Sequence, residues 1–288
     1  MTLRAIVFLT LSALLLTSCS FDITPQITSD TTFEATSDAA LVSDGTLMIC
    51  DVRNVAVLGY PPAMTSGSPL RHSTPALETL LRLDADGNIL PCLAVAWQSN
   101  HEEKTITLNL REGVTFHDGT PFHAEAVKWN LEQQQAANAT GFSHLASIEV
   151  AEEYTVILHL TQWDNTLLPS LCQAQGLMIS PDACQKNGVE WASTHPVGTG
   201  PFRFQNIASD GTISYLRYEN YWQSGKPYLD EIKIVCDDDT SSREYRFREG
   251  RYNVLIRGDT ASLSGFSAEG YQINAITSTG VLPVKRTI

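Results

Sequence analysis

The segment FHDGTPFHAEAVKWN, residues 116–130, gathers residue types that bind metal ions or exchange protons. His117, Asp118, His123 and Glu125 lie within nine positions, and imidazole nitrogens and carboxylate oxygens are ligands that Zn²⁺ takes in hydrolytic sites. A zinc helix carries its two histidines as H-E-x-x-H on one face, whereas five residues separate His117 from His123 here. The segment therefore predicts a structural role. An extracellular metallohydrolase using His117, His123 and Glu125 remains the alternative hypothesis.

Turn signals divide this segment into the end of a strand and the start of a helix. Asp118-Gly119 is typical of a tight turn, and Pro121 biases the residue before it away from the helical conformation. Apolar residues at helical spacing begin at Ala124 and stop before Asn138. His123 takes the N-cap position, where a small hydroxyl side chain would cap more strongly. The pattern predicts a turn followed by a weakly capped helix.

Strands and helices are mixed along the chain without strict alternation and without an internal repeat. KTITLNL, residues 104–110, alternates polar and apolar side chains and predicts a half-buried strand. Residues 47–52 also predict a strand, and the spacing over residues 75–82 predicts a helix. A chain that is 43% hydrophobic can build a sizeable core. The fold class predicted from these patterns is α+β, or mixed α/β.

The first residues have the composition of a secretory signal. The apolar run over residues 5–16 is shorter than the about 20 residues that a membrane span needs. Leu-Thr-Ser-Cys, residues 16–19, resembles the lipobox of bacterial lipoproteins. We therefore expect a signal peptide over residues 1–18, a lipidated Cys19 that anchors the protein to the cell membrane on its extracellular or periplasmic side, and a polar tether over residues 19–45. An uncleaved anchor or a chance cysteine is the alternative.

The charge and the cysteines restrict the classes of partner. The chain has 32 acidic and 19 basic residues, a formal charge of −13 that would repel phosphate backbones, so we expect no nucleic-acid partner. No C-x-x-C pair occurs among the six cysteines, which argues against a zinc knuckle. One disulfide is possible outside the cytoplasm. Cys172 and Cys184 would close the shortest loop, although the sequence does not fix the pairing.

Four stretches, in order and spacing, resemble the family 5 extracellular solute-binding proteins, the oligopeptide-, dipeptide- and nickel-binding components of ABC importers. The resemblance implies a periplasmic-binding-protein-like fold of the class II, or cluster C, type. It also implies capture of a peptide or other small solute without bond chemistry, no cofactor and no metal, and permease and ATPase subunits of an ABC transporter as partners. The matching stretches are LLRLDADGNILPCLAVAW (80–97), KTITLNLREGVTFHDGTPFHAEAVKWN (104–130), HPVGTGPFRF (195–204) and ENYWQSGKPYLDEI (219–232).

The resemblance also implies a division of residues 46–288 into domains. Residues 46–74 and 195–288 would form the first domain, and residues 75–194 a small middle domain. The GTGP sequence at residues 198–201 would lie where the chain returns to the first domain. Its two glycines would permit positive φ angles there.

Candidate ligand-facing residues are carried over loosely from the resemblance. They are Tyr60 in the first loop, Phe142 after the long helix, and Gln173 with Gln175, where some relatives hold an anion with arginine. Ordinary packing is the alternative for Tyr60 and Phe142. The aromatic pair Tyr221-Trp222 could stack on a sugar, but aromatic pairs beside a turn are more often packed on the core, which is the prediction here.

Members of the family are longer than this chain and close a second lobe over the ligand. We therefore expect the sequence to lack most of that lobe. It would be the N-terminal half of such a binding protein, the product of a truncated or split reading frame, or a remnant that binds no ligand. One lobe alone would hold a solute weakly, because half of the contacts would be missing.

Overall fold

The computed structural model describes residues 45–52, 56–64, 67–84, 86–257, 263–273 and 284–286. The predicted signal peptide, Cys19 and nearly all of the predicted tether lie outside these residues. Within the described part of the chain, no helix has both the length and the apolar character needed to cross a membrane.

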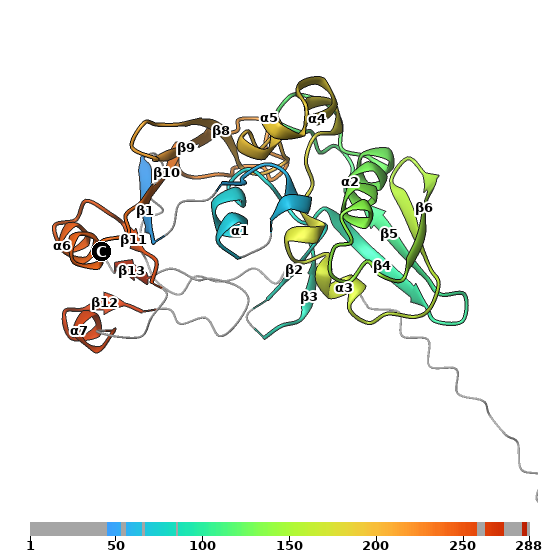
Figure 1. Ribbon diagram of the computed structural model, residues 1–288, viewed down its shortest axis with the longest axis horizontal. Coiled ribbons are helices and arrows are strands. Elements are labelled where there is room, and N and C mark those ends of the chain that lie inside the picture. The colour runs from blue at the N-terminus through green and yellow to red at the C-terminus, as the bar shows by residue number, and fades with distance from the viewer. Residues whose placement is uncertain are drawn as a thin grey trace, which may run out of the picture. The chain divides into compact units, whose positions relative to one another are not determined.

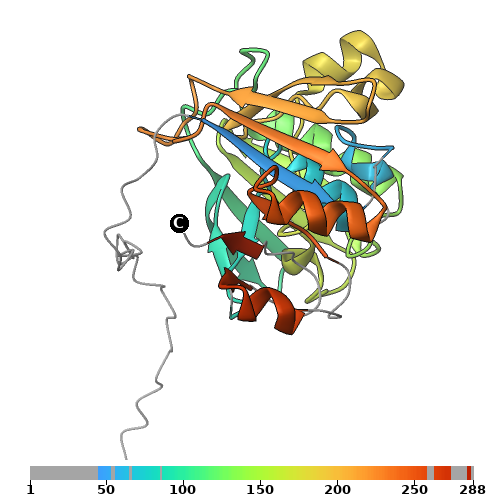
Figure 2. The same cartoon turned by 90° about the vertical axis from the view of Figure 1, so that its left-hand side faces the viewer.

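The larger sheet has seven strands in the order β12-β13-β11-β1-β10-β9-β8. Strand β1 pairs in parallel with β10 and with β11, and the other neighbouring strands pair antiparallel. Figure 2 shows β1 and β10 side by side across this sheet. Strand β1 confirms the strand predicted over residues 47–52. The strands are β1 Thr46–Asp51, β8 Phe202–Ile207, β9 Ile213–Arg217, β10 Glu231–Cys236, β11 Val254–Leu255, β12 Tyr271–Gln272 and β13 Val284–Arg286.

A smaller antiparallel sheet has the order β4-β5-β7-β6, and the 13-residue helix α2 packs against its β6 and β7 strands (Figure 1). Residues of β5 and β7 alternate between buried and less buried positions, so one face of the sheet packs on the core and the other does not. Strand β5 and helix α2 confirm the strand and the helix predicted on either side of residues 116–123. The elements are β4 Ala94–Asn100, β5 Thr105–Leu110, α2 Ala124–Ala136, β6 Leu145–Glu152 and β7 Thr155–Leu160, beside the two-stranded pair β2 Leu81–Leu83 and β3 Ile89–Pro91.

The apolar side chains form two main cores. The buried residues of the first core lie between Leu80 and Met178 and belong largely to α2 and the four-stranded sheet. Those of the second core come from both sides of that span, between Leu58 and Leu77 and between Leu177 and Ile234. The remaining helices are α1 Gly67–Ser73, α3 Leu167–Ser170, α4 Pro181–Asn187, α5 Val189–Thr194, α6 Thr240–Arg248 and α7 Leu263–Ala268, with the 3-10 turns η1 Pro61–Ala63 and η2 Ala174–Gly176.

The helix predicted over residues 75–82 is wrong. Helix α1 ends at Ser73, Thr79 forms a bridge with Leu177, and strand β2 begins at Leu81. The apolar side chains of this short segment are buried on more than one side, with Leu80 and Leu81 both 0% exposed. Periodicity does not distinguish a buried strand from a helix in so short an apolar run.

The prediction that the two glycines of the GTGP sequence serve to permit positive φ angles is also wrong, because neither Gly198 nor Gly200 has a positive φ. A Cβ atom on Gly200 would lie 2.6 Å from the carbonyl oxygen of Pro75, and one on Gly198 would collide with the carbonyl oxygen of Ala76. The Gly200 backbone N–H donates to the same Ala76 carbonyl at 2.9 Å. Glycine is needed here for close approach of two backbone segments.

Cys172 and Cys184 are both free thiols in this structure. Cys172 packs against the first core, and Cys184 belongs to the second core. The disulfide considered between them is therefore not formed in this structure. Burial raises the pKa of the Cys172 thiol to about 11, which makes it a poor nucleophile.

Candidate functional site

Residues 116–123 form the turn that the sequence predicts. The Asp118 carboxylate accepts hydrogen bonds from the Thr120 backbone N–H at 3.1 Å, from the Thr120 hydroxyl at 2.7 Å and from the Ser180 hydroxyl at 2.5 Å. Gly119 has a φ of 86° in the turn. His123 is the N-cap of α2 and makes no side-chain capping bond. Both the turn and the weak cap are confirmed.

His117 joins this turn to the GTGP loop. Its Nε2 lies 2.8 Å from the Gly200 carbonyl oxygen, to which it donates, and its backbone N–H donates to the Gly198 carbonyl at 2.8 Å. The ring packs edge to face on Tyr218, with the centroids 4.8 Å apart. Burial lowers the pKa of His117 from 6.5 to about 4. The imidazole is therefore neutral near pH 7 and holds two segments of backbone together.

The three residues of the metallohydrolase hypothesis do not form one site. The His117 ring packs against Tyr218, whereas His123 and Glu125 line a surface groove of which His117 is not a part. Across the described ranges, no group of three or more His, Cys, Asp or Glu side chains is placed to hold a metal ion. The structure thus provides no support for that hypothesis.

The carboxylate of Glu78 connects three segments that are distant in the sequence. It accepts hydrogen bonds from the Thr199 hydroxyl at 2.9 Å, the Tyr221 hydroxyl at 2.7 Å and the Trp222 indole N–H at 2.9 Å. The Arg111 guanidinium lies 4.1 Å from the Trp222 ring centre. Trp222 packs against the first core, which confirms the packing prediction for the aromatic pair. Sequence reasoning missed Glu78, although one acidic residue in the apolar stretch PALETLLRL is a signal that could have found it.

Tyr60 precedes η1 and reaches helix α2. Its hydroxyl donates to the Gln133 Oε1 atom at 3.3 Å, and its ring packs against the second core. Burial raises the pKa of Tyr60, so the hydroxyl stays protonated near pH 7. Gln133, which sequence reasoning missed, lies in the polar run at the end of α2.

The structure brings Gln173 and Gln175 to the same region. Gln173 is the N-cap of η2 and Gln175 lies within it, and η1, η2 and α2 contact one another. The Gln134 amide donates to the Ala174 carbonyl at 3.4 Å and so ties α2 to η2. The Tyr60 surface is defined here as Tyr60, Gln133, Gln173 and Gln175. The hydroxyl and amide groups of these four residues can both donate and accept hydrogen bonds, which suits a polar group of a ligand.

Phe142 lies elsewhere. Its side chain is 3% exposed and belongs to the first core. The residue packs among apolar side chains in this structure and is not part of the Tyr60 surface. A ligand contact by Phe142 stays a prediction.

The large mixed sheet and the smaller antiparallel sheet with α2 form a periplasmic-binding-protein-like fold, which solved binding proteins share over 79% of this chain. The chain belongs to the bacterial extracellular solute-binding proteins, family 5, whose family model matches residues 88–282. The resemblance drawn from the four sequence stretches is confirmed.

Individual relatives agree with this assignment. The glutathione-binding protein GsiB of Salmonella typhimurium is 32% identical over 193 residues, which are 64% of this chain and 37% of the relative. An ABC transporter substrate-binding protein from Sinorhizobium meliloti is 28% identical with a TM-score of 0.70, over 79% of this chain and 48% of that one. The periplasmic binding protein DppA of Helicobacter pylori, solved with the peptide STSA, is 23% identical with a TM-score of 0.70, over 79% and 49% of the two chains.

The family, the GsiB relative and the Sinorhizobium protein are named as binding proteins and not as enzymes, which is the class that the sequence predicted. The Helicobacter protein supports the fold alone at this level of identity. The chain spans 37% of the length of the curated relative and about half of each solved structure.

Proposed function

We propose that this chain is the substrate-binding component, or part of it, of an ABC importer that captures a peptide or similarly sized solute without bond chemistry. Its partners would be the permease and ATPase subunits of the transporter. The Tyr60 surface would contact the solute.

The observation that carries the proposal is the packing of η1, which Tyr60 precedes, against η2, which follows Gln173 and contains Gln175, in a chain that belongs to a solute-binding family. The hydroxyl and the amides can donate to carbonyl groups and accept from N–H groups, as a peptide backbone requires. The GsiB relative is named for glutathione, itself a small peptide, and this supports the same class of solute.

The test is a solution-binding experiment. Saturation-transfer NMR with glutathione and with short peptides at millimolar concentration should detect at least one bound solute. Tyr60→Ala should raise the Kd of that solute about tenfold, because the substitution removes a hydroxyl and an aromatic contact that are together worth about 1–2 kcal/mol. Tyr228→Ala is the matched control, since Tyr228 is an exposed tyrosine outside the Tyr60 surface. Absence of any bound solute would support the non-binding remnant instead, and an unchanged affinity in Tyr60→Ala would remove the proposed surface.

We further propose the domain division stated above, with residues 46–74 and 195–288 as a first domain and 75–194 as a middle domain. The two cores support it, because the first core draws its buried residues only from residues 80–178. The second core mainly takes residues from both sides of that span. Both ends of the middle domain contact the second core, which also includes Ala76, Leu77, Leu177, Ile179, Cys184 and Ala192.

We also propose that Cys19 carries a lipid that anchors the protein to the outer side of the cell membrane. The apolar run before it and the Leu-Thr-Ser-Cys sequence support this assignment. Cys19→Ala should accumulate as an uncleaved precursor, and metabolic labelling with a fatty acid should mark the wild-type protein and not the variant. Cys236→Ala, which changes a cysteine far from the signal, should be labelled like the wild type. Equal labelling of Cys19→Ala and wild type would rule out the anchor.

A further inference from the structure

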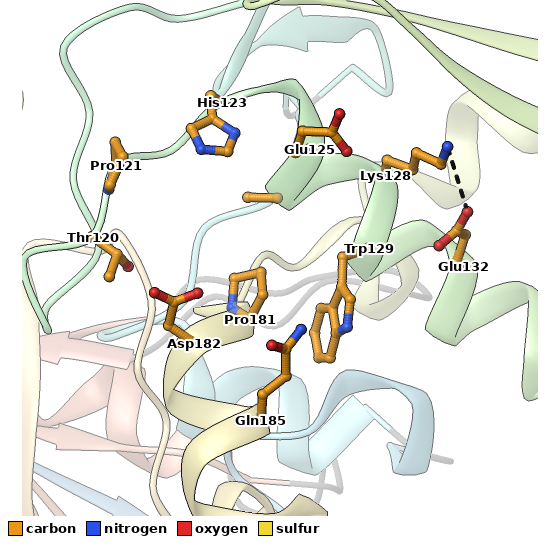
Figure 3. Close-up of a pocket in the computed structure, with 11 residues that line it drawn as sticks. Thr120, Pro121, His123, Glu125, Lys128, Trp129, Glu132, Pro181, Asp182 and Gln185 are labelled. Atoms are coloured by element: carbon orange, nitrogen blue, oxygen red, sulfur yellow. Dashed lines mark ion pairs between the residues drawn. The ribbon is translucent and has the colours of Figure 1, made fainter.

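A groove lies between helices α2 and α4 and has a volume of about 340 Å³, near the lower end of the range for small-molecule sites. Figure 3 shows the Trp129 ring of α2 pointing toward the Gln185 amide of α4, with Pro181 between Trp129 and the Asp182 carboxylate in this view and the His123 ring across from Asp182. None of these residues belongs to the Tyr60 surface. The groove is therefore a separate feature of the chain.

Hydrogen bonds of two polar side chains, Asn130 and Ser180, hold the walls of the groove in place. The Asn130 side chain, 5% exposed, donates to the Ile179 carbonyl at 2.9 Å and accepts from the Ile179 N–H at 3.1 Å, so α2 is held against the segment that leads into α4. Ser180 caps α4 by accepting from the Ala183 N–H at 3.0 Å, and its hydroxyl donates to Asp118 in the neighbouring turn. A ligand would meet walls that are already in place, which lowers the entropic cost of binding.

The lining of the groove combines an aromatic face with an excess of carboxylates over cationic side chains. Trp129 packs against the second core and also lines the groove. Of the charged side chains around it, Lys128 lies 4.0 Å from Glu132 in an ion pair. Within the described part of the chain, no ion pair or side-chain hydrogen bond joins Asp182 or Glu125 to another residue. Glu125 and Asp182 each lie in the first turn of a helix, where a negative charge interacts favourably with the helix dipole.

We propose that this groove binds a small guanidinium compound. A guanidinium is planar, stacks on the face of an indole and can donate two hydrogen bonds to one carboxylate. The Trp129 ring would take the stacked plane, Asp182 would supply the counter-charge, and the Gln185 side-chain oxygen would accept a further N–H. An anionic ligand would be repelled by the same carboxylates. This proposal does not depend on the function proposed above.

The ligand test compares two molecules that differ in charge and not in size. L-Arginine amide and L-citrulline amide are titrated into the full chain, and binding is followed by NMR. Arginine amide should bind with a Kd of about 1 mM, since a half-exposed cation–π contact and an exposed ion pair are each modest. Citrulline amide should bind at least fivefold more weakly. Equal binding of the two amides would overturn the proposal, as would no detectable binding of arginine amide.

Variants locate the bound molecule. Asp182→Asn changes an exposed side chain and should raise the Kd of arginine amide about fivefold. Trp129→Leu should have an effect of similar size. Trp163→Leu is the matched control, since Trp163 lies outside the groove and stacks on His101. Thermal unfolding checks that each variant is folded, and Asp182→Asn alone decides the question if Trp129→Leu is not. Tyr60→Ala should leave the Kd of arginine amide unchanged, which distinguishes this site from the Tyr60 surface. An unchanged Kd in Asp182→Asn would contradict the proposed site.

Discussion

Glu78→Leu is expected to lower the free energy of unfolding by about 3 kcal/mol, because it leaves three donors without their acceptor. The Thr199 hydroxyl, the Tyr221 hydroxyl and the Trp222 indole N–H all donate to the Glu78 carboxylate at 2.7–2.9 Å. Each buried donor that loses its partner costs about 1–3 kcal/mol, and partial access of water reduces the sum. Urea denaturation followed by circular dichroism measures the change.

Two further variants test the cause of that loss. Glu78→Gln keeps one acceptor oxygen and should retain part of the stability. Glu219→Leu is the control, since the Glu219 side chain is 83% exposed and surface changes usually stay within about 0.5 kcal/mol. One donor without an acceptor should already cost about 1 kcal/mol. A smaller decrease in the free energy of unfolding of Glu78→Leu would therefore mean that this network does not hold the three segments together.

His117 should make the stability of the protein fall in acid. Its pKa is lowered from 6.5 to about 4 in the folded protein, so the unfolded chain binds a proton at a higher pH than the folded chain does. The contribution of neutral His117 is therefore present above about pH 6.5 and is lost as the pH falls toward 4. A shift of this size corresponds to about 3 kcal/mol.

The measurement is urea denaturation at several pH values between 7.5 and 4. His117→Gln does not titrate, so its stability relative to the wild type should rise by about 3 kcal/mol as the pH falls through this range. His159→Gln is the control because the His159 side chain is 37% exposed and pairs with a surface carboxylate, Glu149. Parallel pH profiles for the wild type and His117→Gln would show that His117 is not the group responsible.

Local sequence signals predicted the elements that depend on local chemistry. The alternating side chains of residues 104–110 predict β5, and the Asp118-Gly119 turn with Pro121 predicts where α2 begins. The missing cap at His123 follows from its side-chain type alone. In each case the deciding interaction lies within a few residues of the signal.

The features that the sequence did not predict correctly depend on contacts between distant segments. The backbone at residues 75–76 runs so close to Gly198 and Gly200 that glycine is required there for space, and no turn signal reveals such an approach. The same segment continues into β2, and its apolar spacing was interpreted as a helix. The three partners of Glu78 lie more than a hundred residues along the chain. Nothing local in the sequence predicts such pairings.

The candidate site was only partly accessible from the sequence. Tyr60, Gln173 and Gln175 came from the family resemblance, whereas the proposal that they share a surface with Gln133 rests on the packing of η1 and η2 against α2. Phe142 was carried over in the same way, and the structure buries it in the first core. The groove beside Trp129 was not predicted at all, because it is formed by two helices that are about fifty residues apart in the sequence.

The central claim is that a solute contacts the Tyr60 surface. Hydrogen–deuterium exchange of the full chain, with and without the peptide that gives the strongest NMR signal, tests it most directly. The account predicts that the peptide slows exchange in residues 57–64, in the second half of α2 and in residues 173–177, and that Tyr60→Ala removes this protection. Protection by a bound peptide that is confined to other segments, such as α4 or the strands of the seven-stranded sheet, would contradict it.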